Sequence, residues 1–521
     1  MTEKVERDDK ITRAVEVAKE RAFSRRDFLH KSMLGTAAIG AATFALPILS
    51  QRAAGAPLPP DSIDKVYHAG TYGSIQAAID AAEADAGGLV YVPPGNYVVS
   101  GLTLLQNNIW LLGAGAATKI QLQSAPTAPA LKIDGAFSNI LISDLLFDSQ
   151  TVGAGTGVDI RNGTKAMIQR CYFQNLNAGV VFATNSDKPV RVLDSFFFGN
   201  NIHIISNLTR HLITGNVLEN SVNEGLDISS SSQGWVSNNV FLNNNTGATF
   251  NPATEANEQN IISNNYFYGN KGGIDLQLAA NVVVDGNVIE HTVESAGIFV
   301  SGNYAVISNN VIYDTIGLGL PGLWVSAADR TILTGNAVSL SSAEGILLDG
   351  GANEGVIQGN LVFNNSKAAS GGPYSGIQIW ASNNVNVIGN KVFDSDNPQK
   401  QQYGIKLASA TSNIYIQNND LRNNLTGPLS LVGTGHIIKR NIGYLTENGK
   451  SETISPDGVD QSLFKIPHGL AATPTYALVV PGDSLASSVA AWINALDGTH
   501  VHWKYNSAPG GPVALKWYAE V

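Results

Sequence analysis

The sequence predicts an all-β protein built mainly as a parallel β-helix, and its internal repeat supports this prediction. Between Gly157 and Leu431 a Gly-apolar-x-apolar motif, followed by an apolar-Asn-apolar motif, recurs about a dozen times, roughly every 22 to 31 residues. Each repeat contains three short alternating or β-branched runs that are separated by turn residues. A repeat of this size cannot bury its own apolar face, so we expect about 12 stacked coils.

One asparagine precedes the third strand of each repeat. Asn tolerates the left-handed conformation of a tight turn and can hydrogen-bond its equivalent one coil away. We therefore predict a structural ladder formed by Asn216, Asn239, Asn265, Asn287, Asn310, Asn336, Asn360, Asn390 and Asn419.

The N-terminus is predicted to direct export. The segment from Ser24 to His30 contains Arg25 and Arg26 and precedes an apolar stretch, so residues 1–56 resemble a twin-arginine signal peptide. Glycines and a proline interrupt the apolar stretch, which favours cleavage near Ala56 over a permanent anchor. We expect a secreted or extracytoplasmic protein without stable membrane insertion, and an uncleaved anchor is the alternative.

Two further segments complete the expected domains. Residues 57–445 should form the β-helix, with an amphipathic helix at Ser74–Glu83 as a lid over the open end of the core. Residues 446–521 depart from the repeat and alternate apolar and polar residues between Pro and Gly turns. This segment should be a small C-terminal β-sandwich that covers the far end or makes a homo-oligomer.

The segment from Ser74 to Tyr97 carries a more specific resemblance. Its Ser-Ile-Gln-Ala-Ala-Ile-Asp-Ala-Ala stretch is followed by Val-Tyr-Val-Pro-Pro-Gly-Asn-Tyr and then by Asn-punctuated coils. Over roughly residues 65–440 the chain resembles the pectate-lyase-like right-handed β-helix superfamily. The resemblance implies a right-handed fold with substrate on the outer face of the Gly-Ile-x-Leu strands. That superfamily includes lyases, glycoside hydrolases, epimerases, fructan transferases and tailspikes, so the fold does not define the activity.

Charge and cysteine content exclude several classes of function. The formal net charge of −10 argues against a nucleic-acid partner. The single cysteine, Cys171, cannot form an internal disulfide, and no zinc-ligand spacing surrounds it. We expect this thiol to be buried and inert.

The Gly-Ile-x-Leu strands predict a row of outward side chains. The residues that flank x point into the core, so successive x residues should stack about 4.8 Å apart along the solenoid. The row is Asp159, Val181, His203, Asp227, Thr249, Asp275, Phe299, Trp324, Leu347, Gln378 and Lys406, and the next outward positions add Gln277, Asp349 and Trp380. The placement of His203 assumes that its coil, which lacks the glycine, keeps the same register.

Acids in this row predict chemistry on a glycosidic bond. Asp227 and Asp275 are two coils apart, about 9 to 10 Å between backbones, which is compatible with an acid and a base in an inverting hydrolase. Glu224 enters the same strand, and His203 would lie one coil from Asp227 and tune its proton affinity. Solvated surface charges are the structural alternative for each of these side chains.

Larger side chains in the row predict a sugar-binding groove. Phe299, Trp324 and Trp380 are expected to stack on sugar rings, with polar contacts from Gln277, Gln378 and Asp349.

A polysaccharide lyase is the first alternative. It would need a basic residue to remove a proton and often a Ca²⁺ ion, which Asp159, Asp227 and Asp275 could hold. Basic partners are sparse, because Lys406 is several coils away and Arg210 is on another strand. The chain lacks the Arg-x-Pro-x-x-Arg motif of pectate lyases and the Asp-Pro-His motif of alginate epimerases.

The sequence therefore favours an exported carbohydrate-active enzyme, a glycoside hydrolase or an intramolecular glycosyl transferase, that needs no cofactor. Its partner would be a polysaccharide or an oligosaccharide. A Ca-dependent lyase and a non-catalytic glycan-binding or adhesion β-helix remain the alternatives.

Overall fold

The computed structural model describes residues 65–183, 189–207, 210–229, 233–251, 256–257, 259–317, 319–368, 374–396, 398, 400–487 and 489–521. The predicted signal peptide, 1–56, lies outside these residues. The chain divides into two compact units, Met1–Ala328 and Asp329–Val521, which are described in turn. This division falls inside the segment 57–445 that the sequence assigns to one β-helix domain.

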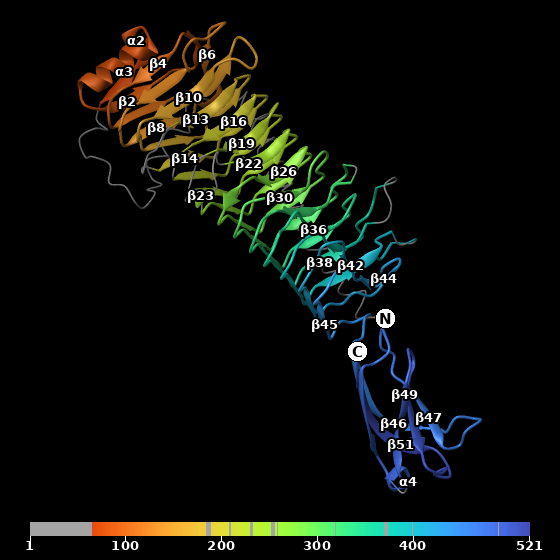
Figure 1. The fold of residues 1–521 in the computed structure, drawn as a ribbon. Coiled ribbons are helices and arrows are strands. Elements are labelled where there is room, and N and C mark those ends of the chain that lie inside the picture. The colour runs from red at the N-terminus through yellow and green to blue at the C-terminus, as the bar shows by residue number, and fades with distance from the viewer. Residues whose placement is uncertain are drawn as a thin grey trace. The chain divides into compact units, whose positions relative to one another are not determined.

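Unit 1 is a parallel β-solenoid in which each coil contributes one strand to each of three sheets (Figure 1). Sheet 1 contains the Gly-apolar-x-apolar strands, and its strands in unit 1 are β4 (Leu102–Leu104), β7 (Leu131–Asp134), β10 (Thr156–Arg161), β13 (Ala178–Ala183), β16 (Ile202–Ser206), β19 (Glu224–Ile228), β22 (Thr246–Phe250), β26 (Gly272–Leu276), β30 (Ile298–Val300) and β33 (Leu323–Ser326). Sheet 2 follows sheet 1 in each coil and contains β1 (Val66–His68), β2 (Gly88–Tyr91), β5 (Ile109–Leu112), β8 (Ile140–Ser143), β11 (Ala166–Gln169), β14 (Val190–Leu193), β17 (His211–Thr214), β20 (Trp235–Ser237), β24 (Ile261–Ser263), β28 (Val283–Asp285) and β31 (Val306–Ser308).

Sheet 3 closes each coil of unit 1. Its strands are β3 (Gly95–Val99), β6 (Thr118–Leu122), β9 (Leu146–Ser149), β12 (Tyr172–Gln174), β15 (Phe196–Phe198), β18 (Val217–Glu219), β21 (Val240–Leu242), β25 (Tyr266–Tyr268), β29 (Val288–Glu290) and β32 (Val311–Tyr313). A separate pair joins β23 (Ala256–Asn257) to β27 (Ala279–Ala280).

Unit 2 contains further coils and an antiparallel module. The coil strands are β36 (Ile346–Asp349), β39 (Ile377–Ile379), β42 (Tyr403–Leu407) and β44 (Gly427–Ser430) of sheet 1, β34 (Ile332–Thr334), β37 (Val356–Gln358), β40 (Asn386–Ile388), β43 (Tyr415–Gln417) and β45 (Ile437–Lys439) of sheet 2, and β35 (Ala337–Ser339), β38 (Leu361–Phe363) and β41 (Lys391–Phe393) of sheet 3. Sheet 1 has 14 strands over the two units, so the coils outnumber the dozen expected. The additional coils, at β4 and β7, precede Gly157. The β4 coil keeps the motif as Gly101-Leu-Thr-Leu, and the β7 coil has Ala130 in place of the glycine.

The core lies inside the solenoid, where the middle residue of each short strand points inward. In sheet 2 the side chains of Ile262, Val284 and Ile307 are fully buried one above the other. In sheet 3 the rings of Phe147, Phe173 and Phe197 stack with centroids 5.1 and 4.7 Å apart. Parallel in-register strands place like residues at the same depth in successive coils, so an apolar column fills the interior.

The predicted asparagine ladder is confirmed. The Asn239 backbone N–H donates to Asn265 Oδ1 at 2.9 Å, and Asn239 Nδ2 donates to the same oxygen at 3.0 Å and to the Ile213 carbonyl at 2.8 Å. The left-handed conformation belongs to the residue before the ladder position, as at Asn238 and Asn264, with φ of 57° and 55°. The ladder side chain therefore hydrogen-bonds the polar groups at the turn, and the residue before it adopts the left-handed conformation that forms the turn.

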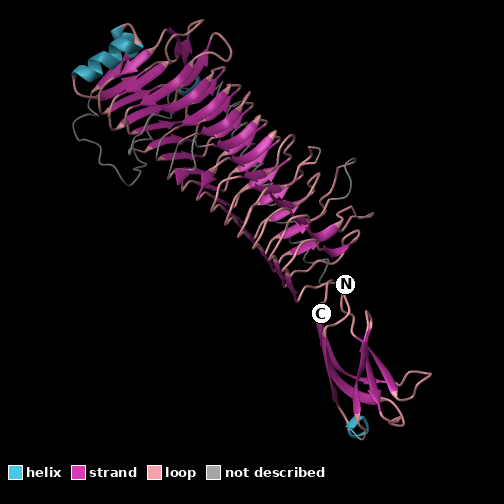
Figure 2. Ribbon diagram, viewed as in Figure 1, coloured by secondary structure: helices cyan, strands magenta, loops and turns pink. Residues whose placement is uncertain are grey.

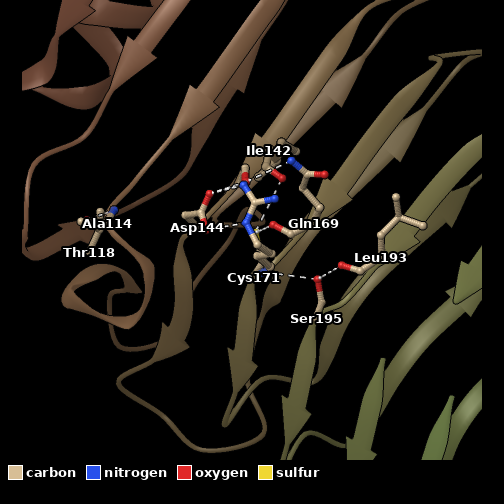
Figure 3. A network of polar contacts seen from close by, with 10 residues as sticks. Ala114, Thr118, Ile142, Asp144, Gln169, Cys171, Leu193 and Ser195 are labelled. Atoms are coloured by element: carbon tan, nitrogen blue, oxygen red, sulfur yellow. Dashed lines mark hydrogen bonds and ion pairs between the residues drawn. The ribbon is translucent and has the colours of Figure 1, made fainter. Parts of the chain in front are cut away.

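The ladder begins with residues other than asparagine. The Cys171 N–H donates to Ser195 Oγ at 3.2 Å (Figure 3). The Ser195 N–H donates in turn to Asn216 Oδ1 at 2.9 Å. Arg170, beside Cys171, pairs with Asp144 at 2.7 Å. Burial raises the pKa of the Cys171 thiol to about 12, so this thiol stays protonated and is inert, as expected.

Among the residues that the structure describes, helices are confined to short segments, and two of them cover the N-terminal end of the coils (Figure 2). They are α2 (Ala69–Tyr72) and α3 (Ile75–Ala84), and the others are η2 (Gly115–Ala117) and α4 (Ser484–Ser487). The Ser74 hydroxyl accepts from the Ala77 N–H at 3.0 Å and caps α3. Ile75 and Ile79 are buried against the first coil, which confirms the predicted lid.

The C-terminal module is an antiparallel sandwich, as predicted. One sheet has the order β46 (Glu447–Ile454), β51 (Val513–Glu520) and β48 (Tyr476–Pro481), and the other has the order β47 (Leu463–Pro467), β50 (His500–Tyr505) and β49 (Ala491–Leu496). Both sheets contribute to one core, which includes Phe464, Trp503 and Trp517. No helix of the described residues is long and apolar enough to cross a membrane.

The ladder should carry a large share of the stability of unit 1. Asn265→Ala removes the acceptor for two donors of Asn239 and the donor to the Val236 carbonyl, leaving buried polar groups unpaired. We expect a loss on the order of 3 kcal/mol and a lower urea midpoint. Asn264→Gly is the control, because Asn264 is exposed and glycine accepts its positive φ. Equal losses in the two variants would contradict the role of the ladder.

Candidate functional site

The strand register of unit 1 aligns one outward residue per coil on sheet 1. Asp227 pairs with Thr249, Thr249 with Asp275, Asp275 with Phe299, and Phe299 with Trp324. Apolar residues on both sides of each of these positions point into the core, as Leu226 and Ile228 do around Asp227. The coil stacking therefore brings carboxyl and aromatic side chains onto one face.

The glycine of the motif has a steric cause. A Cβ at Gly225 would lie 2.7 Å from the Gly247 carbonyl oxygen and 3.0 Å from a ring carbon of Phe241. Gly225 lies within strand β19, and the side chains of Glu224 and Asp227 on either side of it are half-buried. The dipeptide Glu-Gly at the start of a sheet 1 strand therefore indicates a carboxyl group at the edge of the sheet 1 face.

The prediction for His203 is wrong. Ile205, not His203, pairs with Asp227 and Val181, so the register of this coil is shifted by two residues from the one assumed. His203 occupies the position of the missing glycine, where its side chain turns into the core and is fully buried. Its Nδ1 lies 2.9 Å from Asn200 Nδ2, and burial lowers its pKa to about 3. A neutral, enclosed imidazole cannot contact a substrate on the outer face.

Asp275 has the strongest features of a proton donor in unit 1. Its Oδ2 accepts a hydrogen bond from Gln277 Nε2 at 2.6 Å, and its Oδ1 is buried without a protein partner. Burial raises the pKa of this carboxyl, and the hydrogen bond from Gln277 opposes the rise. A half-buried carboxyl with one unpaired oxygen is suited to hold a proton and pass it to a bound molecule.

Asp227 lies in a different environment two coils away. Its Oδ1 accepts a hydrogen bond from Ser229 Oγ at 2.6 Å. Burial raises the pKa of Glu224, and the nearby charge of Asp227 raises it further. The structure therefore brings Glu224, Asp227 and Asp275 to one face, with His203 excluded.

Two aromatic side chains, Phe299 and Trp324, lie in the outward row of sheet 1 in unit 1. Their ring centroids are 5.1 Å apart in an edge-to-face arrangement, and both side chains are half-buried. They occupy the next two coils after Asp275, in the same outward row. A sugar ring stacked on either residue would lie beside the carboxyl of Asp275.

Unit 2 holds the remaining predicted binding residues. Gln378 pairs with Leu347 and Lys406 in the outward row, and Asp349 is half-buried at the end of β36. Trp380 is exposed and its Nε1 donates to Ser409 Oγ at 2.9 Å. These side chains form a second polar and aromatic group on the sheet 1 face of unit 2.

The sequence interpretation missed Glu344. This residue precedes Gly345 as Glu224 precedes Gly225, so the same pair of letters in the repeat could have identified it. The side chain is 5% exposed, and burial raises its pKa to about 7, while the charge of Lys406 opposes the rise. Glu344 and Lys406 give unit 2 an acid and a cation on one face.

Metal binding has little support among the residues that the structure describes. They include no group of three or more His, Cys, Asp and Glu side chains placed to hold an ion. Asp159, a predicted Ca²⁺ ligand, is instead paired with Arg161, with oxygen–nitrogen distances of 2.7 to 3.1 Å. Its carboxylate is already neutralised by its own strand.

A family model described as the right-handed β-helix region matches residues 196–320 and 296–443. The chain is also 29% identical to mannuronan C5-epimerase AlgE3 of Azotobacter vinelandii over 235 residues, which are 41% of this chain and 12% of that protein. AlgE6 of the same organism is 53% identical over 49 residues, 8% of this chain and 6% of that protein. These alignments span only a small part of the relatives' own length.

One solved structure supports the β-helix fold, and a second is similar to a lesser degree. Tailspike protein 3 of bacteriophage CBA120 superposes with a TM-score of 0.51 at 12% identity, covering 73% of this chain and 62% of that chain. The A-module of AlgE4 of Azotobacter vinelandii gives a TM-score of 0.43 at 20% identity, covering 71% of this chain and 95% of that chain. At these identities the likeness concerns the β-helix alone.

Buried histidines should make unit 1 sensitive to acid. Burial lowers the pKa of His203 to about 3 and that of His211 to about 4, while an unfolded histidine titrates near 6.5. Below pH 6.5 the unfolded state binds more protons than the folded state. The free energy of unfolding therefore decreases as the pH is lowered, by up to about 1.4 kcal/mol per pH unit for each histidine. His203→Gln should reduce this slope in urea unfolding between pH 7 and 5. An unchanged slope would contradict the assignment, and exposed His68→Gln is the control.

Proposed function

We propose that this chain, in which residues 196–320 and 296–443 match the right-handed β-helix family model, is an exported enzyme that cleaves glycosidic bonds of an extracellular polysaccharide. The observation that carries the proposal is the pair Asp227 and Asp275 in one outward row, two coils apart, with the pKa of Asp275 raised by burial. The aromatic residues of the next two coils support a sugar substrate.

Each carboxyl has a role that follows from its surroundings. Asp275, protonated, donates its proton to the glycosidic oxygen as the bond to the anomeric carbon breaks. Asp227, oriented by the hydrogen bond from Ser229, accepts a proton from the water that attacks the anomeric carbon from the opposite face. A backbone separation of about 9.6 Å for two coils leaves space for the sugar and this water, which favours inversion. Glu224 lies beside Asp227 and can assist it.

Uronate modification is a second candidate that two observations favour. Sequence matches to mannuronan C5-epimerases cover 41% of the chain, and unit 2 places Lys406 near Glu344. Removing the proton beside a carboxylate needs a cation to neutralise that carboxylate and a group to exchange the proton. The sequence lacks the Asp-Pro-His motif, which is why this candidate stands second.

A product screen separates these candidates. The mature chain, from about residue 56, is incubated with neutral and uronic-acid polysaccharides, with and without Ca²⁺. New reducing ends without ultraviolet absorbance support hydrolysis, and absorbance identifies a lyase. Exchange of sugar protons with solvent without cleavage identifies an epimerase. Glycan binding without any product would leave a non-catalytic binding protein and contradict the proposal.

Substitution of the two acids should abolish cleavage. We expect Asp227→Asn and Asp275→Asn each to lower kcat by a factor on the order of 10³ with sugar binding retained, because each removes one proton-transfer group. Asp285→Asn is the matched control, since Asp285 lies in the coil of Asp275 but on sheet 2, where it accepts from Ser308 Oγ at 2.6 Å. Full activity of Asp275→Asn, or equal losses in all three variants, would reject the assignment.

The pH profile should respond to Gln277. The hydrogen bond from Gln277 lowers the pKa of Asp275, so Gln277→Leu should raise that pKa further. If Asp275 acts as the acid, the variant stays protonated to higher pH and the alkaline limb of kcat moves upward. Gln174→Leu, on sheet 3, should leave the limb in place. A shift toward lower pH in Gln277→Leu would show that Asp275 is not the proton donor.

A further inference from the structure

The C-terminal sandwich carries a shallow, open cavity on one outer face. The cavity has a volume of about 560 Å³ and lies over β46 and β51, where Glu447, Gly449, Lys450, Lys516 and Tyr518 line it. All of its lining residues belong to the C-terminal module of unit 2. It is therefore separate in sequence from the carboxyl groups of sheet 1.

Gly449 creates the cavity. It pairs directly with Tyr518 across the antiparallel strands β46 and β51. A Cβ at this position would lie 3.3 Å from Tyr518 Cδ2 and 2.6 Å from the Trp517 carbonyl oxygen. Because glycine has no side chain, no neighbour on β46 covers the ring of Tyr518 at the position directly opposite it.

The ring of Tyr518 is held in place at its hydroxyl. The Tyr518 oxygen lies 2.6 Å from Glu520 Oε2 and 3.0 Å from Glu447 Oε2. Glu447 is itself paired with Arg440 at 3.0 Å. An aromatic ring that is already immobilised loses little conformational entropy when a ligand stacks on it.

Polar and apolar groups surround this ring in alternation. Lys516 lies two residues earlier on the same face of β51 and has no carboxylate partner within the described part of the chain. Leu478 pairs with Tyr518 from β48 and is exposed, and the ring of Tyr476 lies 6.4 Å from that of Tyr518. The face thus combines a stacking surface with an amine and two carboxylates at its edges.

A pyranose ring matches this arrangement. Its C–H face stacks on an aromatic ring, and its hydroxyl groups hydrogen-bond to charged side chains around the edge. A protein partner fits less well, because it would bury the charges of Lys516, Glu447 and Glu520, and interface cores are depleted of such charges.

We infer that the C-terminal module is a glycan-binding module that stacks a sugar ring on Tyr518, with Lys516 and Glu447 as hydrogen-bonding partners. This role goes beyond the proposed cleavage reaction and does not depend on it. The module would keep the protein attached to a polysaccharide.

Native affinity electrophoresis tests the inference with the mature chain carrying Asp275→Asn, so that the polymer is not consumed. Gels contain polymannuronate, polygalacturonate, dextran or soluble β-glucan. We expect retardation by at least one polymer, and Tyr518→Ala should weaken the apparent affinity about tenfold, which corresponds to about 1.4 kcal/mol. Lys516→Ala, which replaces an exposed side chain, should also weaken the apparent affinity for the polymer.

Trp492→Ala is the matched control. Trp492 is an exposed aromatic residue of the module, whereas Tyr518 is half-buried, and it lies on β49 in the opposite sheet. Retardation that is equal in Tyr518→Ala, Trp492→Ala and the parent, or absent with every polymer, overturns the inference. So does a change of sedimentation mass in Tyr518→Ala with unchanged retardation, which would assign this face to a second copy of the chain.

Discussion

The stacking of one coil on the next through parallel, in-register strands is the constraint on which the rest of the structure depends. It places equivalent residues above one another at about 4.8 Å, so any residue type that recurs in the repeat becomes a column in space. Apolar residues become the core, and Asn239, Asn265 and Asn287 become a hydrogen-bonded ladder. The column of outward residues on sheet 1 becomes a surface whose chemistry changes coil by coil, from Asp227 to Trp324.

Most of the fold could be predicted because the same sequence pattern recurs in successive coils. The lid helix, its Ser74 cap, the ladder and the row through Asp227 and Asp275 all follow from local patterns that the structure retains. His203 could not be placed, because a histidine in the glycine position looks like an outward residue two positions later in the motif. A second ladder lies at the turn after sheet 3, where the Ser221 N–H donates to Asn244 Oδ1 and the Asn244 N–H donates to Asn270 Oδ1. The sequence did not reveal it, because the side chains at this position vary between coils.

The candidate site shows where sequence patterns stop being sufficient. Residue types and register identify which carboxyl groups face outward, but proton affinity depends on burial by loops of unequal length. Asp275 and Glu344 have raised pKa values because neighbouring chain segments exclude water from them. Tyr518 is comparable, since its exposure depends on Gly449 from a strand about seventy residues earlier in the chain.

A solenoid also makes the distance between functional groups a whole number of coils. The coil that contains β22 separates Asp227 from Asp275 with a single intervening residue, Thr249. Removing that coil in register would bring the two acids from about 9.6 Å to about 4.8 Å, from the spacing used with water to the spacing used for a covalent glycosyl intermediate. Duplicating it would separate them beyond either reaction. Gain or loss of a single repeat could therefore switch the stereochemical outcome in this architecture without changing either carboxyl group.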